Sequence, residues 1–335
     1  MTGFELYLKT NSKAFDRYLA TFFGDGTHPD MSRYLYTPLR KFSDNSGKRH
    51  RPLICLLACE AVGGEPKKAW PAAAAIEHFH TAALIHDDIE DCSLTRRDEP
   101  CMHVCEGTGL AVNAGDLALA LVCGTVVNDP GLEDPMKIRV LAELVDMTTR
   151  TIEGQALDIG WARDGRFDLS VDDYLTMANH KTAFYSGAVP LAVGAIIGGG
   201  STAQVETLRS FGMAAGLAFQ IQDDVLNLVG TKESTKKDFR SDVAEGKRTL
   251  VAIHSLRTTR KKQRLLEILS ARTIDPALLG EAVEIMEQSG SLDFARNYAR
   301  DLVVEAKQGL IEALPKTKAR DLLASMADFF VIRSS

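Results

Sequence analysis

The chain lacks three features that would each assign it to a common class of protein: an excess of basic residues, a secretory leader and a low-complexity linker. Its 39 lysines and arginines are outnumbered by 45 acids, and the net charge of −6 argues against a nucleic-acid-binding surface. No signal peptide precedes the six cysteines, which all lie in the first 123 residues, so we expect reduced thiols in a cytoplasmic protein. Cys101, His103 and Cys105 stand close together, but their spacing matches no common zinc site. Without a linker to divide it, the chain is expected to form one domain, residues 1–335.

An uninterrupted membrane-spanning run is also missing. The longest uncharged stretch, residues 182–205, has the length of a membrane span, but Pro190 and three consecutive glycines from Gly198 to Gly200 interrupt it. These interruptions favour a buried helix that ends at the glycines, so we expect no transmembrane anchor.

Alternation of polar and apolar residues is scarce, whereas apolar residues at helical spacing occur along most of the chain. The pattern predicts helices over residues 52–62, 68–92, 108–127, 135–160, 171–198, 202–229, 241–257, 261–270, 275–288, 292–313 and 317–332. The breaks between them contain Gly, Pro, Asp or Asn. We therefore expect an all-α domain, a bundle of ten or more helices with the apolar middle helices at its centre.

One of these apolar helices contains the acidic sequence DDIED. On a helix, Asp87 and Asp91 lie on one face a turn apart, and Asp88 lies beside them. Like charges at this spacing need compensation from water on a solvated face or from cations. The preceding sequence IEHFHTAALI is too apolar for an ordinary solvated face, which favours cations, and Mg²⁺ prefers carboxylate oxygens.

A second apolar helix repeats the pattern in the sequence GLAFQIQDDVLNLVG. Asp223 and Asp224 are followed by Asn227 one turn later, and Gln220 lies one turn before Asp223. Two aspartate pairs within apolar helices predict two walls of one pocket, with metal ions between them.

Basic residues accompany both acidic clusters. They are Lys48, Arg49, Arg51, Arg96, Arg97, Lys181, Lys237 and Lys247. Each alone reads as a solvated surface charge. Together, bases that bind phosphate and acids that bind Mg²⁺ describe a pocket for a pyrophosphate group.

From about Lys48 to the C-terminus, the sequence resembles the trans-isoprenyl diphosphate synthases, or polyprenyl synthetases. DDIED followed by RR is similar to the first aspartate-rich motif of that family, and FQIQDDVLN is similar to the second. EGQALDIGW (with Gln155 and Asp158), HKT and SDVAEGKRT occur in the family's order. The resemblance implies an isoprenoid synthase fold, all-helical around a deep central cavity, and a homodimer.

The resemblance also implies a reaction. Three Mg²⁺ ions per active site would bridge the aspartate motifs and an allylic diphosphate, whose ionisation is followed by head-to-tail attack of isopentenyl diphosphate and loss of a proton. The metal-contacting residues would be Asp87, Asp88, Asp91, Asp223 and Asp224, which with Arg96 and Lys181 form the catalytic set. The allylic diphosphate would be held by Arg96, Lys181, Thr182, Gln220, Lys237 and Lys247, and isopentenyl diphosphate by Lys48, Arg51, His80 and Arg97.

Four positions depart from the family pattern. Asn227 stands where many members have a third aspartate, which predicts weaker Mg²⁺ binding. Ser46 and Arg240 replace common glycines, and Asp98, followed by Glu99, stands where a glycine is frequent.

The resemblance further implies that residues before the first aspartate motif limit product length. Ala83 and Ala82, four and five residues before Asp87, leave the first level open, and Phe79 closes the level one turn deeper. A helical turn rises about 5.4 Å, close to the length of one isoprene unit. We therefore expect a twenty-carbon product, geranylgeranyl diphosphate. If Phe79 instead packs elsewhere in the core, the product would reach 25 carbons or more; a farnesyl diphosphate synthase is the shorter alternative.

Four other interpretations stay open. A terpene cyclase would share the fold and the metals, but it would not need the residues assigned to isopentenyl diphosphate. A non-catalytic subunit of a heteromeric synthase would be expected to have lost acids that are present here. A metal phosphohydrolase built on His86 and Asp87 would leave the second acidic cluster unexplained. An irregular, branching coupling enzyme of the same family is the fourth.

Overall fold

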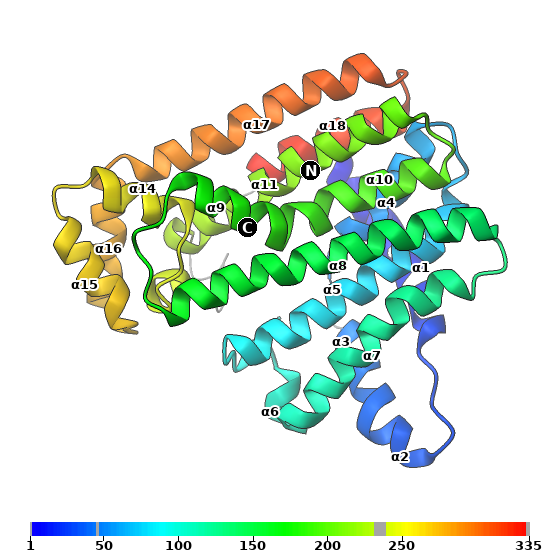
Figure 1. Ribbon diagram of the computed structural model, residues 1–335, viewed down its shortest axis with the longest axis horizontal. Coiled ribbons are helices and arrows are strands. Elements are labelled where there is room, and N and C mark those ends of the chain that lie inside the picture. Colours follow the sequence, from blue (N-terminus) through cyan, green and yellow to red (C-terminus); the bar gives the residue numbers. More distant parts are fainter. Residues whose placement is uncertain (1, 45–46, 231–238, 333–335) are drawn as a thin grey trace. The chain divides into compact units, whose positions relative to one another are not determined.

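The computed structural model describes residues 2–44, 47–230 and 239–332, and most of these residues are helical (Figure 1). The α-helices are α1 (Gly3–Leu19), α2 (Pro29–Met31), α3 (Thr37–Asp44), α4 (His50–Ala61), α5 (Trp70–Glu90), α6 (Met102–Glu106), α7 (Thr108–Val127), α8 (Asp134–Arg163), α9 (Val171–Ala178), α10 (Val189–Ile197), α11 (Thr202–Val229), α13 (Ser241–Ala244), α14 (Leu250–Thr258), α15 (Lys262–Ala271), α16 (Pro276–Gln288), α17 (Ser291–Ala313) and α18 (Lys318–Ile332). Short 3₁₀ or π segments are η1 (Ala20–Phe22), η2 (Ser32–Tyr36), η3 (Pro66–Ala69) and η4 (Asn179–Ala188), and a two-stranded hairpin pairs β1 (Thr95–Arg96) with β2 (Glu99–Pro100). The predicted all-α fold is confirmed.

The chain forms two compact units. The first comprises Met1–Thr148, Val189–Leu208 and Ala313–Ser325, and the second comprises Thr149–Ala188, Arg209–Glu312 and Met326–Ser335. Four helices contribute residues to both units: α8, α11, α18 and, through its last residue Ala313, α17.

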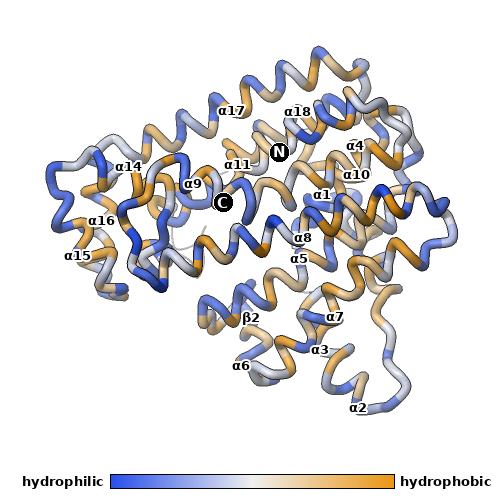
Figure 2. Tube along the Cα trace, viewed as in Figure 1, coloured by the Kyte–Doolittle hydropathy of each residue, from blue (hydrophilic) through white to orange (hydrophobic). Residues whose placement is uncertain are grey.

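In the first unit, α5 packs along α7 and against α4, and α10 packs against α4 (Figure 1). These helices approach closely because small residues line the contacts. A Cβ atom on Gly115 of α7 would meet the ring of His86 on α5, and one on Gly194 of α10 would meet the Cys55 carbonyl of α4. Nearly every residue of α4 and all of α10 are buried, in agreement with their apolar sequences (Figure 2). Burial on all sides, rather than one amphipathic stripe, makes them core helices.

In the second unit, η4 and α11 come into backbone contact. A Cβ atom on Gly187 would lie 2.1 Å from the Gly212 carbonyl oxygen, and one on Gly216 would lie 2.8 Å from Ala183 Cα. The predicted helix over residues 171–198 is therefore present as α9, η4 and α10, with a π-helical middle. Such wide turns are frequent at functional sites, and this one carries Lys181 and Thr182. The prediction that residues 182–205 form buried helix up to the glycines is confirmed as far as Ile197.

Two expectations about the helices were wrong. The segment 241–257 is two helices, α13 and α14, because Gly246 between them has a φ of +66° and a Cβ there would lie 2.5 Å from the Leu269 carbonyl oxygen. The sequence pattern also gave no helix before residue 52, although α1 begins with a capping box formed by Thr2 and Glu5.

The core of the first unit contains an uncharged histidine. His78 of α5 is fully buried against the edges of Phe22 and Phe23, at centroid distances of 5.6 and 5.5 Å. Within the described part of the chain, neither ring nitrogen has a hydrogen-bond partner. Burial disfavours the charged form and lowers the pKa of His78 from 6.5 to about 3.

We therefore expect acid to destabilise the protein through His78. Below pH 6.5, His78 binds a proton in the unfolded chain but not in the folded protein. The free energy of unfolding therefore falls as the pH falls toward 3. At pH 5 the loss is about 2 kcal/mol. Urea denaturation at pH 7.5 and pH 5 should show a smaller difference for His78→Gln than for the wild type. The exposed His28→Gln variant should keep the wild-type difference; an unchanged difference in His78→Gln would assign the acid sensitivity to other groups.

Candidate active site

The first acidic cluster lies at the C-terminal end of α5, and Arg96 of the β1–β2 hairpin reaches it. Arg96 Nε donates to Asp88 Oδ1 at 2.8 Å, and its Nη2 donates to Asp87 Oδ2 at 3.4 Å. Asp91 forms the C-cap of the helix, where its backbone N–H donates to the Asp87 carbonyl. The structure therefore joins the first acidic motif to the first of the two predicted arginines.

Asp88 is the buried member of this cluster. Its side chain is 1% exposed, and Oδ2 has no hydrogen-bond partner among the residues that the structure describes. A buried carboxylate oxygen with no donor is costly unless a cation or a ligand meets it. The donor set of Asp87, Asp88 and Asp91 consists of oxygens only and so fits Mg²⁺, which fills its remaining positions with water and phosphate oxygens. Among the described residues, no group of three or more His, Cys, Asp or Glu side chains is arranged in this structure so that it could hold a metal ion.

The basic cluster predicted for isopentenyl diphosphate lies in the same unit. Arg51 Nη1 donates to His80 Nε2 at 3.2 Å, and both side chains are largely enclosed. Burial, and then the charge of Arg51, hold the pKa of His80 well below its usual range, so His80 stays neutral. Arg97 approaches the same loop, because a Cβ on Gly47 would lie 3.2 Å from its Nη2. Lys48 is exposed on this loop.

In the second unit, Lys181 and Thr182 of η4 contact two different neighbours. Lys181 Nζ donates to Asp158 Oδ2 of α8 at 2.5 Å. Burial opposes ionisation of Asp158, but the charge and hydrogen bond of Lys181 outweigh it and lower its pKa. Thr182 Oγ1 donates to Gln220 Oε1 at 2.8 Å. The HKT motif is thereby connected to α8, which carries the EGQALDIGW sequence, and to α11.

Asp224 of the second motif is held from both sides. Gln220 Nε2 donates to its Oδ1 at 2.7 Å, and the hydroxyl of Tyr174 in α9 donates to its Oδ2 at 2.8 Å. Burial, reinforced by the like charges of Asp242 and Asp223, raises the pKa of Asp224 well above its usual range. Crowded acids of this kind fit a cation. Tyr174 was missed from the sequence; its place seven residues before Lys181, on the same helical face, was the one available signal.

Asn227, at the position of the family's third aspartate, hydrogen-bonds the first residues of α13. Its Nδ2 donates to Ser241 Oγ at 2.9 Å, and its Oδ1 accepts the Asp242 backbone N–H at 3.1 Å. Lys247 Nζ lies 3.0 Å from Glu245 Oε2 and 3.9 Å from Asp242 Oδ1. The amide therefore fastens the start of α13 to the second motif. Lys237 and Ser46 lie outside the described residues.

Two departures from the family pattern have a backbone explanation. Asp98 and Arg240 have φ values of +67° and +60°, in the left-handed region that glycine adopts most easily. The glycines expected at these positions therefore reflect backbone geometry, which this chain reaches with other residues. Arg240 also covers the ring of Phe239 at 4.7 Å.

The residues predicted to set chain length lie on α5 of the first unit. Phe79 and Ala82 are buried, whereas Ala83 is partly accessible. His86, the proposed start of a phosphohydrolase motif, instead faces α7, with Nε2 3.4 Å from the Val112 carbonyl oxygen and 3.6 Å from Asp116 Oδ1.

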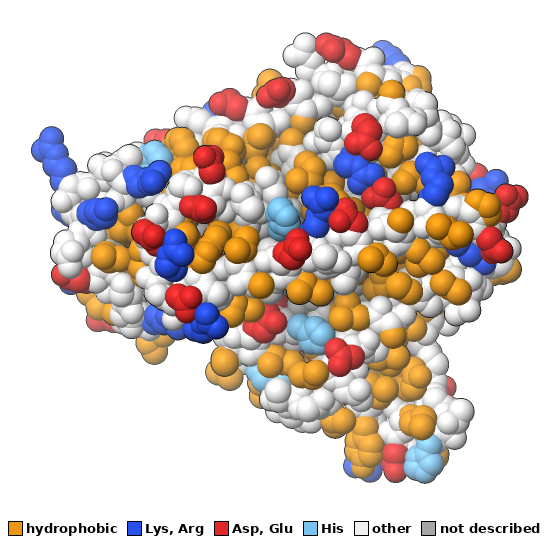
Figure 3. Space-filling model, in the orientation of Figure 1, with side chains coloured by type: hydrophobic (Ala, Val, Ile, Leu, Met, Phe, Trp, Pro, Cys, Tyr) orange, Lys and Arg blue, Asp and Glu red, His pale blue; other side chains and the backbone are white. Residues whose placement is uncertain are grey.

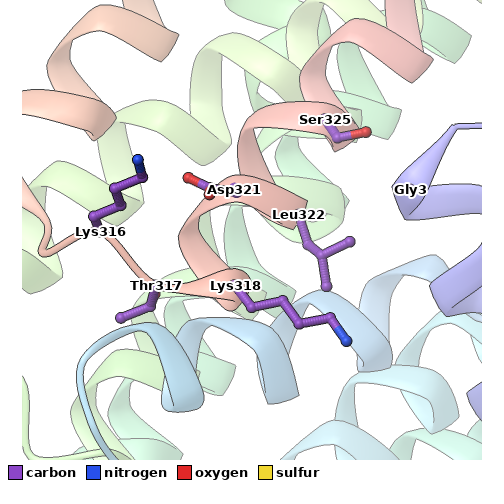
Figure 4. Close-up of a pocket in the computed structure, with 7 residues that line it drawn as sticks. All are labelled: Gly3, Lys316, Thr317, Lys318, Asp321, Leu322 and Ser325. Atoms are coloured by element: carbon purple, nitrogen blue, oxygen red, sulfur yellow. The ribbon is translucent and has the colours of Figure 1, made fainter.

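A separate hollow lies in the first unit where α18 begins (Figure 4). Its lining residues are Gly3, Lys316, Thr317, Lys318, Asp321, Leu322 and Ser325. None of the predicted site residues lines it.

Comparisons with known proteins agree with these motifs. The polyprenyl synthetase family model matches residues 32–286. A short chain isoprenyl diphosphate synthase of Methanothermobacter thermautotrophicus is 42% identical over 289 residues, covering 86% of each chain. A geranylfarnesyl diphosphate synthase of Natronomonas pharaonis is 35% identical over 318 residues, covering 90% of each.

Solved structures share the fold. Geranylgeranyl pyrophosphate synthetase of Pyrococcus horikoshii superposes with a TM-score of 0.90 at 32% identity, covering 98% of each chain. Geranylgeranyl pyrophosphate synthase of Corynebacterium glutamicum, complexed with isoprenyl diphosphate and magnesium, gives 0.87 at 27% identity, covering 99% of each chain.

Proposed function

Since this chain belongs to the polyprenyl synthetase family, and is therefore a prenyltransferase that elongates prenyl chains, we propose that it makes geranylgeranyl diphosphate. It would condense isopentenyl diphosphate head-to-tail with an allylic diphosphate in the presence of Mg²⁺. The observation that supports this most strongly is Asp88, a buried carboxylate with one oxygen held by Arg96 and the other without a donor among the described residues. The same proposal includes a cytoplasmic location.

The metal-holding residues would be Asp87, Asp88 and Asp91 in the first unit, and Asp223 and Asp224 in the second, with three ions as the proposed number. Bound Mg²⁺ would neutralise the charge that develops on the departing diphosphate, the term on which electrostatic catalysis acts most strongly.

The chain's own residues would perform the remaining tasks. Arg96 and Lys181 are already oriented by carboxylates and so present fixed positive charge to the allylic diphosphate. Arg51 and Arg97, with neutral His80, would bind the diphosphate of isopentenyl diphosphate. The apolar length of α5 would exclude water from the reacting carbons, and the departed pyrophosphate is the proposed acceptor of the proton.

We propose that Phe79 sets product length, because its side chain would block further growth of the prenyl chain along α5. The relatives make both twenty-carbon and geranylfarnesyl products by name, so the chain's own α5 must decide. We expect the wild type to stop at twenty carbons, Phe79→Ala to add one unit, and Ala83→Phe to stop at fifteen. Mass spectrometry of dephosphorylated products measures this. Phe15→Ala removes a buried ring of α1 that faces Trp70 and should leave product length unchanged. A wild type that makes mainly 25-carbon product, with no change in Phe79→Ala, would contradict this role of Phe79.

We also propose that the protein works as a homodimer whose contact face includes α7 and α8. Along α8, Ile138, Val145, Ile152 and Ile159 recur every seven residues and are 40–68% exposed. Hydrophobic side chains gather over α7 and α8 in Figure 3. A heptad stripe of branched residues on a 30-residue helix is typical of packing against another helix, and a second copy supplies one with the same pattern.

Among the helices that the structure describes, α7 is the one that is long and apolar enough to cross a membrane, and 39% of its apolar stretch is buried. We assign its exposed side to the same interface. Light scattering should give twice the 36.6 kDa of one chain for the wild type and a single chain for Val145→Glu. Val304→Glu, at a similarly exposed site on α17, should remain dimeric. A monomeric wild type at micromolar concentration would contradict the interface.

A further inference from the structure

A buried ion pair lies next to the basic cluster of the first unit, and the mechanism above gives it no role. Arg49 is 5% exposed and Glu77 is 2% exposed. Arg49 Nη1 donates to Glu77 Oε1 at 2.5 Å and Nε donates to Asp16 Oδ1 at 2.7 Å, while Nη2 donates to the Ser43 carbonyl oxygen. Every nitrogen of this guanidinium is therefore occupied, and Arg49 is tied to α1, α3 and α5 at once.

Stability alone does not account for this pair. Burying two charges costs desolvation energy that their attraction repays only with good geometry, and apolar replacements are often as stable. Arg49 also has a φ of +51°, a left-handed conformation that is unfavourable for arginine. Local costs of this kind persist where a functional site needs a fixed geometry.

The position of Arg49 in the chain suggests which site benefits. It lies between Lys48 and Arg51 at the start of α4, so the three points that hold Arg49 also fix the backbone on which its neighbours stand. Glu77 stands three residues before His80 on α5, on the same helical face, and His80 contacts Arg51. The pair therefore joins the loop and the helix that supply this cluster.

The geometry around Gly47 adds an electrostatic task. A Cβ atom on Gly47 would lie 3.2 Å from Arg97 Nη2 and 3.5 Å from Arg49 Nη1, so two guanidinium groups meet at one glycine. Burial lowers the pKa of Arg97, and the charges of Arg49, Arg96 and Arg51 lower it further, whereas Glu77 raises it. Glu77 thus offsets the repulsion between cations that converge before any diphosphate is bound.

We propose that Glu77 is a positioning residue for isopentenyl diphosphate: acting through Arg49, its carboxylate fixes the loop that carries Lys48 and Arg51 and offsets the charge beside Arg97. The proposal rests on the function proposed above. It assigns Glu77 to one substrate, because Arg96, which is proposed for the allylic diphosphate, is held separately by Asp87 and Asp88.

The test is steady-state kinetics of Glu77→Gln with each substrate varied in turn. We expect the KM for isopentenyl diphosphate to rise about tenfold, while the KM for the allylic primer and kcat stay within about threefold. Glu77→Asp keeps the charge and should recover part of the loss. Asp16 is the other carboxylate that binds Arg49, and its side chain is 43% exposed. Asp16→Asn should therefore raise the KM for isopentenyl diphosphate only about twofold.

A readout that does not need turnover completes the test. Isopentenyl diphosphate, added without metal, should raise the melting temperature of the wild type more than that of Glu77→Gln. Folded Glu77→Gln with an unchanged KM for isopentenyl diphosphate and an unchanged thermal shift would overturn the role. An equal rise in both KM values with a fall in kcat would also overturn it, as a merely structural effect. If Glu77→Gln fails to fold, Arg49→Lys, which keeps the charge but loses the three-way contact, should show the same selective rise. A wild type that binds isopentenyl diphosphate but never incorporates it would refute the proposed function and leave the thermal-shift test of Glu77 standing.

Discussion

Replacing Asp88 by asparagine is expected to reduce kcat by at least about 100-fold. The change preserves shape but removes the charge of a side chain that is 1% exposed, whose Oδ1 orients Arg96 and whose Oδ2 has no hydrogen-bond partner in the described part of the chain. In the proposed mechanism, the leaving diphosphate then loses both a metal-holding oxygen and the fixed position of Arg96. Initial rates with labelled isopentenyl diphosphate, measured across a Mg²⁺ titration, should show lower turnover and a higher Mg²⁺ requirement.

Glu90 supplies the matched control for Asp88. It belongs to the same acidic sequence and the same helix end, but it is exposed. Glu90→Gln should keep turnover within about threefold of the wild type. If Asp88→Asn behaved like Glu90→Gln, the first acidic cluster would be a solvated surface and the catalytic assignment of α5 would be wrong.

Replacing Gly154 by alanine is expected to lower kcat/KM about 100-fold, although Gly154 is not among the residues proposed to bind substrate. A Cβ at this position of α8 would lie 2.2 Å from the backbone nitrogen of Lys181 and 2.7 Å from its Cα. Backbone cannot rotate away as a flexible side chain does, so η4 must move by roughly 1 Å. That movement displaces the Lys181 ammonium from Asp158 and from the allylic diphosphate that Lys181 is proposed to hold. The overpacking should also cost about 1–3 kcal/mol of stability.

Gly160→Ala, on the same helix, is the control for Gly154→Ala: it replaces glycine with alanine without a steric clash. A Cβ on Gly160 would meet nothing within 4 Å. Gly160→Ala should keep wild-type kcat/KM and stabilise the helix by up to about 1 kcal/mol. Rates compared well below both melting temperatures decide the matter; wild-type activity in Gly154→Ala would show that η4 tolerates the shift or that Lys181 does not act as proposed.

The helices that could be predicted from the sequence are those with a long apolar period, such as α5, α7 and α11. The acidic pairs on α5 and α11 were predictable too, because charge within an apolar helix is unusual at the level of the sequence itself. The N-terminal helix α1 was missed although Thr2 and Glu5 gave a capping signal and Phe4, Leu8, Phe15 and Leu19 recur at helical spacing and are buried.

The remaining features depend on contacts between distant segments. Tyr174 reaches Asp224 across 50 residues, and Arg49 reaches Glu77 across 28, so no local pattern reports either contact. The π-helical segment η4 contains Gly187, whose close approach to Gly212 only the folded structure reveals. Left-handed backbone at Asp98 and Arg240 was signalled only by the glycines that the family often has at these positions, because arginine itself rarely adopts this conformation and aspartate only sometimes does.

The most direct test of the account is incorporation of labelled isopentenyl diphosphate by the purified protein with Mg²⁺ and, separately, dimethylallyl, geranyl or farnesyl diphosphate. Mass spectrometry of the dephosphorylated products should show a predominantly twenty-carbon prenyl alcohol, and chelation of the metal should abolish it. Folded protein that incorporates no isopentenyl diphosphate with any primer would contradict the synthase assignment, and would favour a cyclase or a non-catalytic subunit of the same fold.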